Sequence, residues 1–462
     1  MRVPLKIVEE NGNGSNPIHT NPDPYIIRWK DSYYVYSSGN DGIKVLHSKD
    51  LQSFTEYKYA YKNEQEYSYW APALFERKGI FHLYYSSLKK GETDDHLHFL
   101  RVATSSNPLG PFVYKATLTD YFSIDPHVIQ SGDSTYIYYA ANIQENTRNG
   151  RIGTAIWLDE LLTPFQMAGK AKPVLLPSID EEIFARNRFG DGKDWHTLEG
   201  PYYLSDGENS WLMYSGNAFT SPDYFVGYAR GRKCEDLRQI TWDKYPSDNE
   251  YQPLVREKNK IEGTGHNSVT QAPDHITPII VYHGRIQGGK TNAAEDDREM
   301  FIDYMWRENQ ELKTNAPSKE GIKSLPYPDI CYLEEIARNE GEWGSGGEVV
   351  ITRDFKIALP KRDSLYIELC ILSEEGSINI FASEDARNAL VTLEGNYWQR
   401  IGILFMNHTV RIRKSEEWIK PILCEKPTDL FFKLEGSVKL QYLDCTFLQA
   451  DGGNRNPLSC LL

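Results

Sequence analysis

The sequence predicts an all-β protein, a five-bladed β-propeller followed by a C-terminal β-sandwich domain. Three observations lead to this fold class. A unit made of a hairpin and a further strand occurs five times before residue 312. A carboxylate or an aromatic ring stands directly ahead of the first strand in each copy. Beyond residue 346 the repeat gives way to a series of short strands separated by polar turns.

Each repeated unit opens with a hairpin whose strands alternate between apolar and polar residues and are rich in tyrosine. The five hairpins begin at residues 25, 73, 127, 201 and 268, and their turns read KD, KG, SGD, DGE and PDH. Such turns between alternating strands predict antiparallel pairing. Successive sheets that cannot hide their own faces favour a radial array, in which each sheet covers the next. A β-sandwich with chance similarity among its hairpins is the alternative.

The end of the repeat divides the chain into three predicted segments. Residues 1–315 form the propeller, residues 316–345 a linker, and residues 346–462 the β-sandwich accessory domain. The linker run NAPSKEGIKSLPYPD is rich in turn-forming residues, which disfavour regular structure. Short strands with polar turns are typical of a sandwich. A chain of 462 residues is long enough to build two separate cores.

Composition and charge exclude several classes of function. The 51 Lys and Arg residues against 65 Asp and Glu residues give a net charge of −14, without a long basic run. This balance argues against nucleic acid or an anionic membrane as a partner and favours a neutral substrate. Homo-oligomerisation is left open. The N-terminal residues show no apolar signal segment, so a cytoplasmic location is expected, or a secreted one if a signal peptide has been removed.

The residues ahead of the five hairpins form a chemically coherent set. In chain order they are Asp23, Trp70, Asp125, Glu199 and His266. In a radial array the first strand of every sheet lies beside the central axis, so these five side chains should converge there. Each has a structural alternative, because the acids could cap turns or form ion pairs and the rings could be core residues.

Two of the acids are followed by proline, and this suggests how they are held. Pro24 and Pro126 should push Asp23 and Asp125 toward an extended backbone. Several acids fixed near an aromatic wall suit glycoside hydrolysis, in which one carboxylic acid protonates the leaving oxygen. A second carboxylate then activates water or attacks the anomeric carbon.

The motifs NPDPYIIRWKDSYYVYSS, YWAPALF, SIDPHVI, EGPYY, GTGHNSVTQAPD, YHGR and REMFIDYMW, taken in order, resemble glycoside hydrolase family 43. The resemblance covers roughly residues 15 to 312. It implies a five-bladed propeller and a reaction that inverts the anomeric configuration. It also implies that Asp23 is the general base, Glu199 the general acid, and Asp125 the carboxylate that raises the pKa of the acid. Inversion requires room for a water, roughly 6.5 to 9.5 Å between base and acid.

The resemblance also implies residues that bind the substrate or an ion. Arg298 would contact substrate hydroxyls and the base, Trp70 would flank the pocket, and Arg285 is a further substrate-binding candidate. His266 matches an axial histidine that binds water, Ca²⁺ or Na⁺ in some members. No cofactor is expected to be required. Two further residues that could line the site are Tyr203 and Phe219.

The substrate is less well defined, because two features of the chain point to different branches of the family. A C-terminal sandwich is frequent in β-xylosidases, whereas the GTGHNSVTQAPD run resembles arabinofuranosidases and arabinanases. We expect an exo-acting α-L-arabinofuranosidase that releases arabinose from arabinan or arabinoxylan oligosaccharides, as in hemicellulose degradation. A β-xylosidase or a bifunctional enzyme is the first alternative. A non-catalytic carbohydrate-binding propeller and a retaining β-fructosidase relative are the others.

Overall fold

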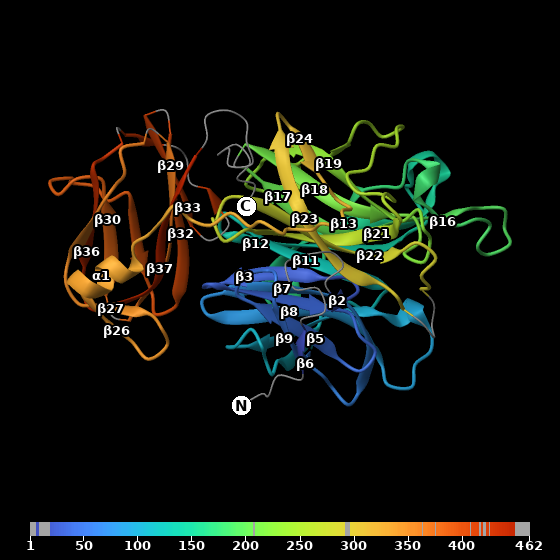
Figure 1. The fold of residues 1–462 in the computed structure, drawn as a ribbon. Coiled ribbons are helices and arrows are strands. Elements are labelled where there is room, and N and C mark those ends of the chain that lie inside the picture. Colours follow the sequence, from blue (N-terminus) through green and yellow to red (C-terminus); the bar gives the residue numbers. More distant parts are fainter. Residues whose placement is uncertain are drawn as a thin grey trace.

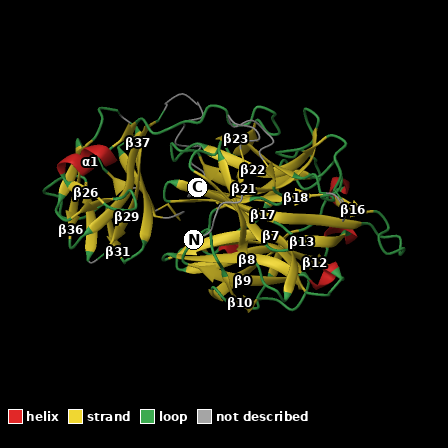
Figure 2. Ribbon diagram, turned by 60° about the horizontal axis from the view of Figure 1, so that its bottom comes forward, coloured by secondary structure: helices red, strands yellow, loops and turns green. Residues whose placement is uncertain are grey.

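The computed structural model is built almost entirely from β-strands (Figures 1 and 2). It describes residues 6–8, 19–206, 208–291, 296–362, 364–374, 376–406, 408–414, 417–418, 422–424 and 426–448. Within these ranges α1 (Leu333–Asn339) is the one α-helix. The short 3-10 helices are Asp95–Leu97, Arg148–Gly150, Asp180–Glu182 and Leu237–Gln239. The prediction of an all-β protein is confirmed.

The N-terminal sheets contain all five predicted hairpins as antiparallel pairs. The first sheet has the order β1 (Lys6–Val8), β6 (Phe54–Tyr61), β5 (Ile43–Ser48), β4 (Ser32–Ser37), β3 (Tyr25–Trp29). The second has the order β10 (Val113–Thr117), β9 (Phe99–Ser105), β8 (Ile80–Lys89), β7 (Glu66–Arg77). The hairpins β3–β4 and β7–β8 are the first two copies of the repeat.

The third and fourth copies are joined into one larger sheet. Its order is β11 (Ser123–Ser131), β12 (Ser134–Ile143), β13 (Ile152–Thr163), β17 (Trp195–Ser205), β18 (Asn209–Gly216), β19 (Phe225–Arg232), β20 (Asp243–Lys244). Three short strands pair at its margins: β14 (Gln166–Met167), β15 (Lys172–Leu175) and β16 (Ile183–Ala185). A short parallel ladder between β13 and β17 connects two halves that are each antiparallel.

The fifth copy pairs with the start of the chain. Its sheet has the order β2 (His19–Thr20), β23 (Glu299–Glu308), β22 (Pro278–Ile286), β21 (Ile261–Gln271), with β24 (Glu311–Thr314) on β23. The pairing of His19 with Met300 and of Thr20 with Glu299 ties residues just ahead of the first repeat to the last repeat.

Hydrophobic cores separate neighbouring sheets along the whole N-terminal part. One such cluster lies between each successive pair of repeats. A further cluster joins the last repeat to the first, with Ile26, Tyr33 and Val35 packed near Ile279 and Val281. The strands are therefore buried on both faces, which explains why they contain many tyrosine residues. A tyrosine ring fills the core, and its hydroxyl can still reach a polar partner.

The C-terminal strands form two antiparallel sheets around one shared core. The larger has the order β26 (Gly341–Trp343), β27 (Val349–Ile351), β37 (Val438–Phe447), β29 (Leu365–Ser373), β32 (Trp398–Met406), β33 (Thr409–Lys414), β34 (Glu417–Trp418). Strand β25 (Ile330–Cys331) pairs with β37, and β35 (Ile422–Leu423) with β33. The smaller has the order β28 (Phe355–Ala358), β36 (Asp429–Leu434), β30 (Ser377–Phe381), β31 (Val391–Glu394).

The segment expected to be a linker, residues 316–345, contains regular structure in its second half. Strand β25, helix α1 and strand β26 fall within it and belong with the C-terminal sheets. The expected domains also include residues 1–5, 9–18 and 449–462, which lie outside the described residues. The boundaries of the three predicted segments stay a prediction. No helix in the described ranges has the length and apolar character needed to cross a membrane.

The C-terminal sheets contact turns that follow the first strands of the repeats. The Lys30 ammonium lies 4.1 Å from the Trp398 ring centroid, beyond the end of β3. In the turn after β21, His275 Nε2 lies 2.7 Å from Asp444 Oδ2. At the end of β21, Gln271 accepts a hydrogen bond of 3.0 Å from Arg400. Figure 1 accordingly shows the C-terminal sheets at one end of the N-terminal sheets.

A buried acid organises this contact. Glu368 is fully buried and lies 2.8 Å from both Arg400 and Arg413. Burial alone would raise the pKa of Glu368, but the two guanidinium charges lower it well below its usual range.

Replacing Glu368 with Ala is expected to lower the free energy of unfolding by about 3 to 5 kcal/mol, because two arginines lose the buried charge that compensates them. Urea denaturation followed by tryptophan fluorescence measures the change. The control is Glu374→Ala, which removes a more exposed partner of Lys439 in the same sheet. A loss for Glu368→Ala no larger than that of the control would contradict the expectation.

Candidate active site

The predicted site residues lie at or beside a left-handed backbone position in every repeat. The positive φ angles are 53° at Asp23, 40° at Ala71, 57° at Asp125, 58° at Gly200 and 50° at His266. The strand register also shifts at these points in β7, β11, β17 and β21. Bulges of this kind bend a strand and redirect a side chain. The repeat therefore delivers side chains to a common place through irregular backbone.

The expected effect of the prolines on the backbone is wrong. Asp23 and Asp125 precede Pro24 and Pro126, yet their φ angles of 53° and 57° are left-handed and not extended. Proline disfavours the right-handed helical region for the residue before it. Aspartate tolerates the left-handed region better than most residues. At Asp125 this conformation coincides with the register shift in β11, whereas Asp23 precedes β3, which pairs with β4 without a shift.

Asp23 lies in a network of hydrogen-bonding groups. Its Oδ1 lies 3.0 Å from Arg298 Nη1, and its Oδ2 accepts a hydrogen bond of 2.6 Å from Ser38 Oγ. Two histidines also face Oδ1, His283 with Nδ1 at 3.1 Å and His266 with Nδ1 at 3.5 Å. Both carboxylate oxygens are thus held, and the acid has a fixed orientation.

These neighbours keep Asp23 ionised. Burial alone would raise its pKa, but the positive charge of Arg298, with contributions from His266 and His283, lowers it well below the usual value. Burial also lowers the pKa of His266 to about 4. His266 is therefore neutral near pH 7, so the full positive charge beside Asp23 comes from Arg298.

Glu199 has an environment of the opposite kind. Its carboxyl group accepts one hydrogen bond of 2.6 Å, from the hydroxyl of Tyr224. Burial raises the pKa of Glu199 to about 7, and the negative charge of Asp23 acts in the same direction, against the lowering effects of Tyr224 and Arg298. Glu199 can therefore carry a proton near neutral pH while Asp23 does not.

Asp125 connects the two acids. Its Oδ2 accepts a hydrogen bond of 2.9 Å from the Gly200 N–H, next to Glu199, and lies 3.8 Å from His266 Nδ1. Burial raises the pKa of Asp125 well above its usual value, and the charges of Glu199 and Asp23 raise it further. Like charges in one buried site titrate as a coupled set, so loss of a proton from Asp125 and from Glu199 is linked.

Arg298 is fixed from its other side. Its Nε and Nη2 donate to Asp296, at 2.9 and 2.8 Å, and its guanidinium lies 4.9 Å from the ring centroid of Phe219. The N–H of Asn21 donates to the Arg298 carbonyl, at 3.3 Å, alongside the β2–β23 pairing. The arginine expected to contact the base is therefore beside Asp23, and Phe219 lies in the same place.

The remaining predicted residues have different surroundings. Trp70 stacks on the buried ring of His98, with 3.6 Å between the centroids. It adjoins the site through Ala71, whose N–H donates to Ser38. Tyr203 is a buried core residue whose hydroxyl lies 2.8 Å from Ser210 Oγ.

Arg285 is occupied by protein partners. Its guanidinium donates to Glu262 and to the carbonyl oxygens of Phe219 and Thr220, at 3.3, 3.4 and 3.0 Å. These bonds hold the loop after β18 against β21. The structure does not bring Arg285 into contact with the three acids.

The described residues offer no group of three ligating side chains for the ion expected beside His266. In the part of the chain that the structure describes, no three His, Cys, Asp or Glu side chains are grouped so as to hold a metal ion. Asp23, the nearest acid to His266, is already bound by Arg298. The Ca²⁺ or Na⁺ site expected beside His266 stays a prediction.

Sequence reasoning missed four residues that touch the site. They are Ser38, Tyr224, His283 and Asp296. His283 stands two positions before Arg285 in the motif YHGR, so this motif carried a usable signal. Ser38 is the last residue of the motif NPDPYIIRWKDSYYVYSS, which also contains Asp23. No local feature marks Tyr224 or Asp296.

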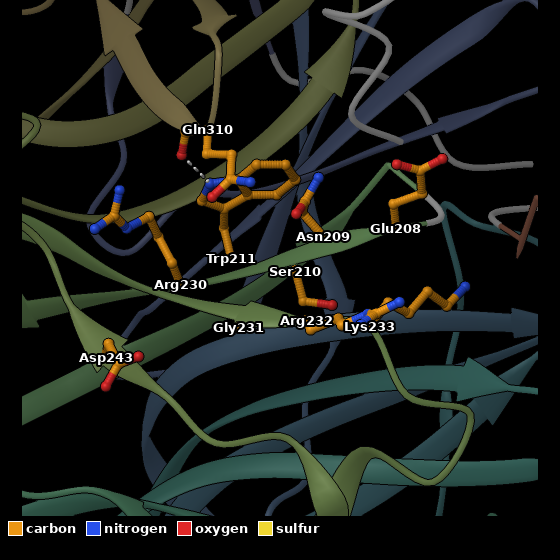
Figure 3. A pocket seen from close by; sticks show the side chains of 10 residues that line it. All are labelled: Glu208, Asn209, Ser210, Trp211, Arg230, Gly231, Arg232, Lys233, Asp243 and Gln310. Carbon is orange, nitrogen blue, oxygen red and sulfur yellow. Dashed lines mark hydrogen bonds between the residues drawn. The ribbon is translucent and has the colours of Figure 1, made fainter.

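A separate pocket of about 850 Å³ opens at the other end of the fourth repeat (Figure 3). It is lined by Glu208, Asn209, Ser210, Trp211, Arg230, Gly231, Arg232, Lys233, Asp243 and Gln310. Asn209 begins β18, whereas Ser215, which pairs with Glu199, lies near the other end of that strand. The pocket is therefore distinct from the three acids.

Replacing Tyr224 with Phe is expected to shift the basic limb of the pH–activity profile upward by about one unit and to lower kcat. The hydroxyl stabilises ionised Glu199, and a hydrogen bond to a charged group contributes about 1.5 kcal/mol. The profile of kcat/KM against pH measures the shift. Tyr282→Phe is the control, because its equally buried hydroxyl donates to Asp303. A basic limb unchanged in Tyr224→Phe, or moved equally in the control, would contradict the expectation.

Residues 15–310 match the family model of Glycosyl hydrolases family 43. An extracellular exo-α-(1→5)-L-arabinofuranosidase of Streptomyces avermitilis is 22% identical over 346 residues, which cover 70% of this chain and 68% of that protein. A second protein with this name, from Streptomyces chartreusis, is 23% identical over 287 residues, 58% of this chain and 82% of the relative. The crystal structure of a thermostable family-43 glycoside hydrolase is 29% identical, with a TM-score of 0.57. It covers 68% of this chain and 99% of its own.

The expected cytoplasmic location is contradicted by these relatives. Both Streptomyces enzymes are named as extracellular. The expectation rested on the character of the N-terminal residues alone, and those do not determine where the protein works.

Proposed function

Since this chain belongs to glycoside hydrolase family 43, we propose that it is an exo-acting α-L-arabinofuranosidase that inverts the configuration of the sugar it releases. One observation carries the proposal: two buried carboxyl groups whose pKa values are shifted in opposite directions. Asp23 is held ionised by Arg298, whereas burial raises the pKa of Glu199 to about 7. Acid and base roles are assigned by such divergent environments.

In this proposal Asp23 is the general base and Glu199 the general acid. Asp23 takes a proton from water as the water oxygen bonds to the anomeric carbon of arabinose. Glu199 gives its proton to the glycosidic oxygen as the bond from that oxygen to the anomeric carbon breaks. The products are arabinose of inverted configuration and the shortened oligosaccharide. Asp125 accepts a hydrogen bond from the Gly200 N–H beside the acid, and its protonation is coupled to that of Glu199.

The proton on Glu199 has a defined place. Because Tyr224 donates to Oε1, that oxygen acts as an acceptor and the acidic proton belongs on Oε2. After proton transfer the same hydroxyl stabilises the new carboxylate. Arg298 keeps Asp23 oriented through a bond that does not depend on the protonation state of Glu199.

The substrate assignment rests on the relatives and on the position of the C-terminal sheets. Two relatives are named exo-α-(1→5)-L-arabinofuranosidases. The described C-terminal contacts fall on turns after the first strands, at the ends away from Asp23 and His266. A sandwich reaching over the pocket was the feature that favoured a β-xylosidase, and these contacts do not support it.

We also propose how the fold serves this function. The five repeats with shared cores are taken as the blades of a five-bladed propeller, with a β-sandwich formed by the two C-terminal sheets. The second domain begins near residue 330, where β25 joins the C-terminal sheets. In this proposal the protein acts on an oligosaccharide outside the cell, which is supported by two relatives named as extracellular.

A panel of 4-nitrophenyl glycosides tests the proposal. Hydrolysis of the α-L-arabinofuranoside should exceed that of the β-D-xyloside and the β-D-galactoside, and NMR should detect the inverted anomer first. Preference for the xyloside would move the assignment to β-xylosidase. Initial release of the retained anomer would overturn inversion, and no hydrolysis of these glycosides or of arabino-oligosaccharides would favour a binding protein.

A further inference from the structure

The loop before β17 presents an aromatic side chain to solvent. It spans residues 186–194, and Phe189 near its middle is 59% exposed. Strand β16, from which the loop departs, lies in Figure 1 at the end of the N-terminal sheets away from the C-terminal sheets. Binding residues are disproportionately carried by loops that a rigid scaffold positions.

Hydrogen bonds within the loop fix its shape. Asp194 accepts from the Asn187 N–H and from Arg186 Nη1, both at 2.9 Å. The Asn187 side chain accepts from the Gly192 N–H at 2.7 Å. The loop is thus ordered in advance of any partner, and such preorganisation lowers the entropic cost of binding.

An arginine packed among rings supports Phe189. The Arg188 guanidinium carbon lies 5.0, 5.4 and 5.2 Å from the ring centroids of Phe184, Phe189 and Trp195. Phe189 also packs edge to face on Trp195, with 5.5 Å between centroids. Trp195 is buried and anchors the group, so the outermost ring is held in one orientation while most of it faces solvent.

The guanidinium of Arg188 is available as a donor. No hydrogen bond or ion pair joins it to any other residue that the structure describes, and its contacts are those with the three rings. An arginine has five N–H donors in a planar fork. Together with an exposed ring, these donors suit a sugar, which offers both hydroxyl groups and an apolar C–H face.

The position of this group relative to Glu199 indicates which part of a substrate it would meet. Trp195 and Glu199 lie on the same strand, four residues apart, which corresponds to about 13 Å. Glu199 protonates the leaving oxygen in the proposed function, so the remainder of the oligosaccharide starts at this acid. A chain continuing outward along β17 would reach Phe189, whereas the sugar being released would not.

We propose that Arg188 and Phe189, supported from beneath by Phe184 and Trp195, form an accessory surface that binds sugar rings on the leaving-group side of a neutral pentose oligosaccharide. The inference rests on the proposed function for the identity of the sugar. It assigns to the loop a part in holding long substrates, separate from the chemistry at the acids. Packing of the loop alone would require only Phe184 and Trp195 around Arg188, and would not require an exposed phenyl ring.

Binding to an inactive variant tests the surface independently of catalysis. In full-length Glu199→Gln protein, isothermal titration calorimetry would measure affinity for α-1,5-linked arabinohexaose and for arabinose. Adding Phe189→Ala is expected to weaken hexaose binding about fivefold to tenfold, since an aromatic contact contributes about 1 to 1.5 kcal/mol. Arabinose binding should not change.

The matched control is Phe165→Ala, which removes another exposed phenyl ring from the turn between β13 and β14. The proposed surface would be contradicted if Phe189→Ala left the affinity for hexaose unchanged, or if the control lost as much affinity. Failure of the Glu199→Gln parent to bind hexaose would contradict it as well. The wild-type protein could fail to hydrolyse arabinosides while Phe189→Ala still weakens hexaose binding. That result would contradict the proposed function and support the sugar-binding surface.

Discussion

Replacing Glu199 with Gln is expected to lower kcat on an arabino-oligosaccharide by about 10²- to 10⁴-fold. Glutamine accepts the Tyr224 hydrogen bond as glutamate does, but it has no proton to give to the leaving oxygen. The loss should shrink as the leaving group becomes more acidic, because a good leaving group departs without protonation. Comparing the natural substrate with 4-nitrophenyl and 2,4-dinitrophenyl arabinosides measures this trend.

The pH profile gives a second measure of the same change. In the parent enzyme, activity should fall as the pH rises through about 7, where Glu199 loses its proton. The variant should lack this basic limb. Glu160→Gln, which alters a partner of Arg238 on β13, serves as the control and should keep the parental profile. Equal losses on all three substrates would argue that Glu199 is not the acid.

Replacing Asp23 with Asn is expected to cost a similar factor, about 10²- to 10⁴-fold in kcat, without dependence on the leaving group. The amide can still bind Arg298 and Ser38, but it cannot take a proton from water. The acidic limb of the profile, which the low pKa of Asp23 places well below neutral pH, should disappear. Steady-state kinetics on the same three arabinosides measures both effects.

The control for this variant is Asp31→Asn, in the turn after β3, where the carboxylate pairs with Lys49 and is more exposed. It changes the same residue type in the same repeat and should leave kcat unchanged. Activity of Asp23→Asn within a few-fold of the parent would remove Asp23 from the role of base. A loss that grows with poorer leaving groups would instead assign it to protonation.

The register of the repeat was sufficient to predict that the two aspartates lie close to His266. Asp23, Asp125 and His266 stand at equivalent positions before or within the first strands, and the structure brings both acids within ion-pair distance of His266. A periodic pattern carries this information because equivalent positions in successive sheets face the same axis. The all-β class followed from the same alternation.

The backbone at these positions could not be predicted in the same way. The rule for residues before proline predicted an extended conformation, but the backbone is left-handed at both Asp23 and Asp125, and at Asp125 it coincides with a bulge in β11. Local rules describe the preference of a dipeptide, whereas the bulge arises from pairing with the next strand. The location of the bulges is therefore information that only the assembled sheet contains.

Side chains that come from segments far away in the sequence were also missed by the prediction. Tyr224, in the loop after β18, contacts Glu199. His283 contacts Asp23, from which it is separated by 260 residues in the sequence. The sequence contains His283 and Arg285 on one face of a strand, and spacing alone does not decide which of them approaches the acid. The structure has His283 beside Asp23 and Arg285 against the loop after β18.

The pairing of β2 with β23 has a consequence for the order in which the enzyme becomes competent. Asp23 and Arg298 are separated by 275 residues, and Ser268 bonds both the carbonyl of Pro24 and the N–H of Ile26. A ribosome must therefore release nearly all of the first 300 residues before base and arginine can meet. Closing so long a loop is entropically unfavourable until the intervening sheets have packed. Hydrolytic competence should thus appear only after the fifth repeat has paired with the first.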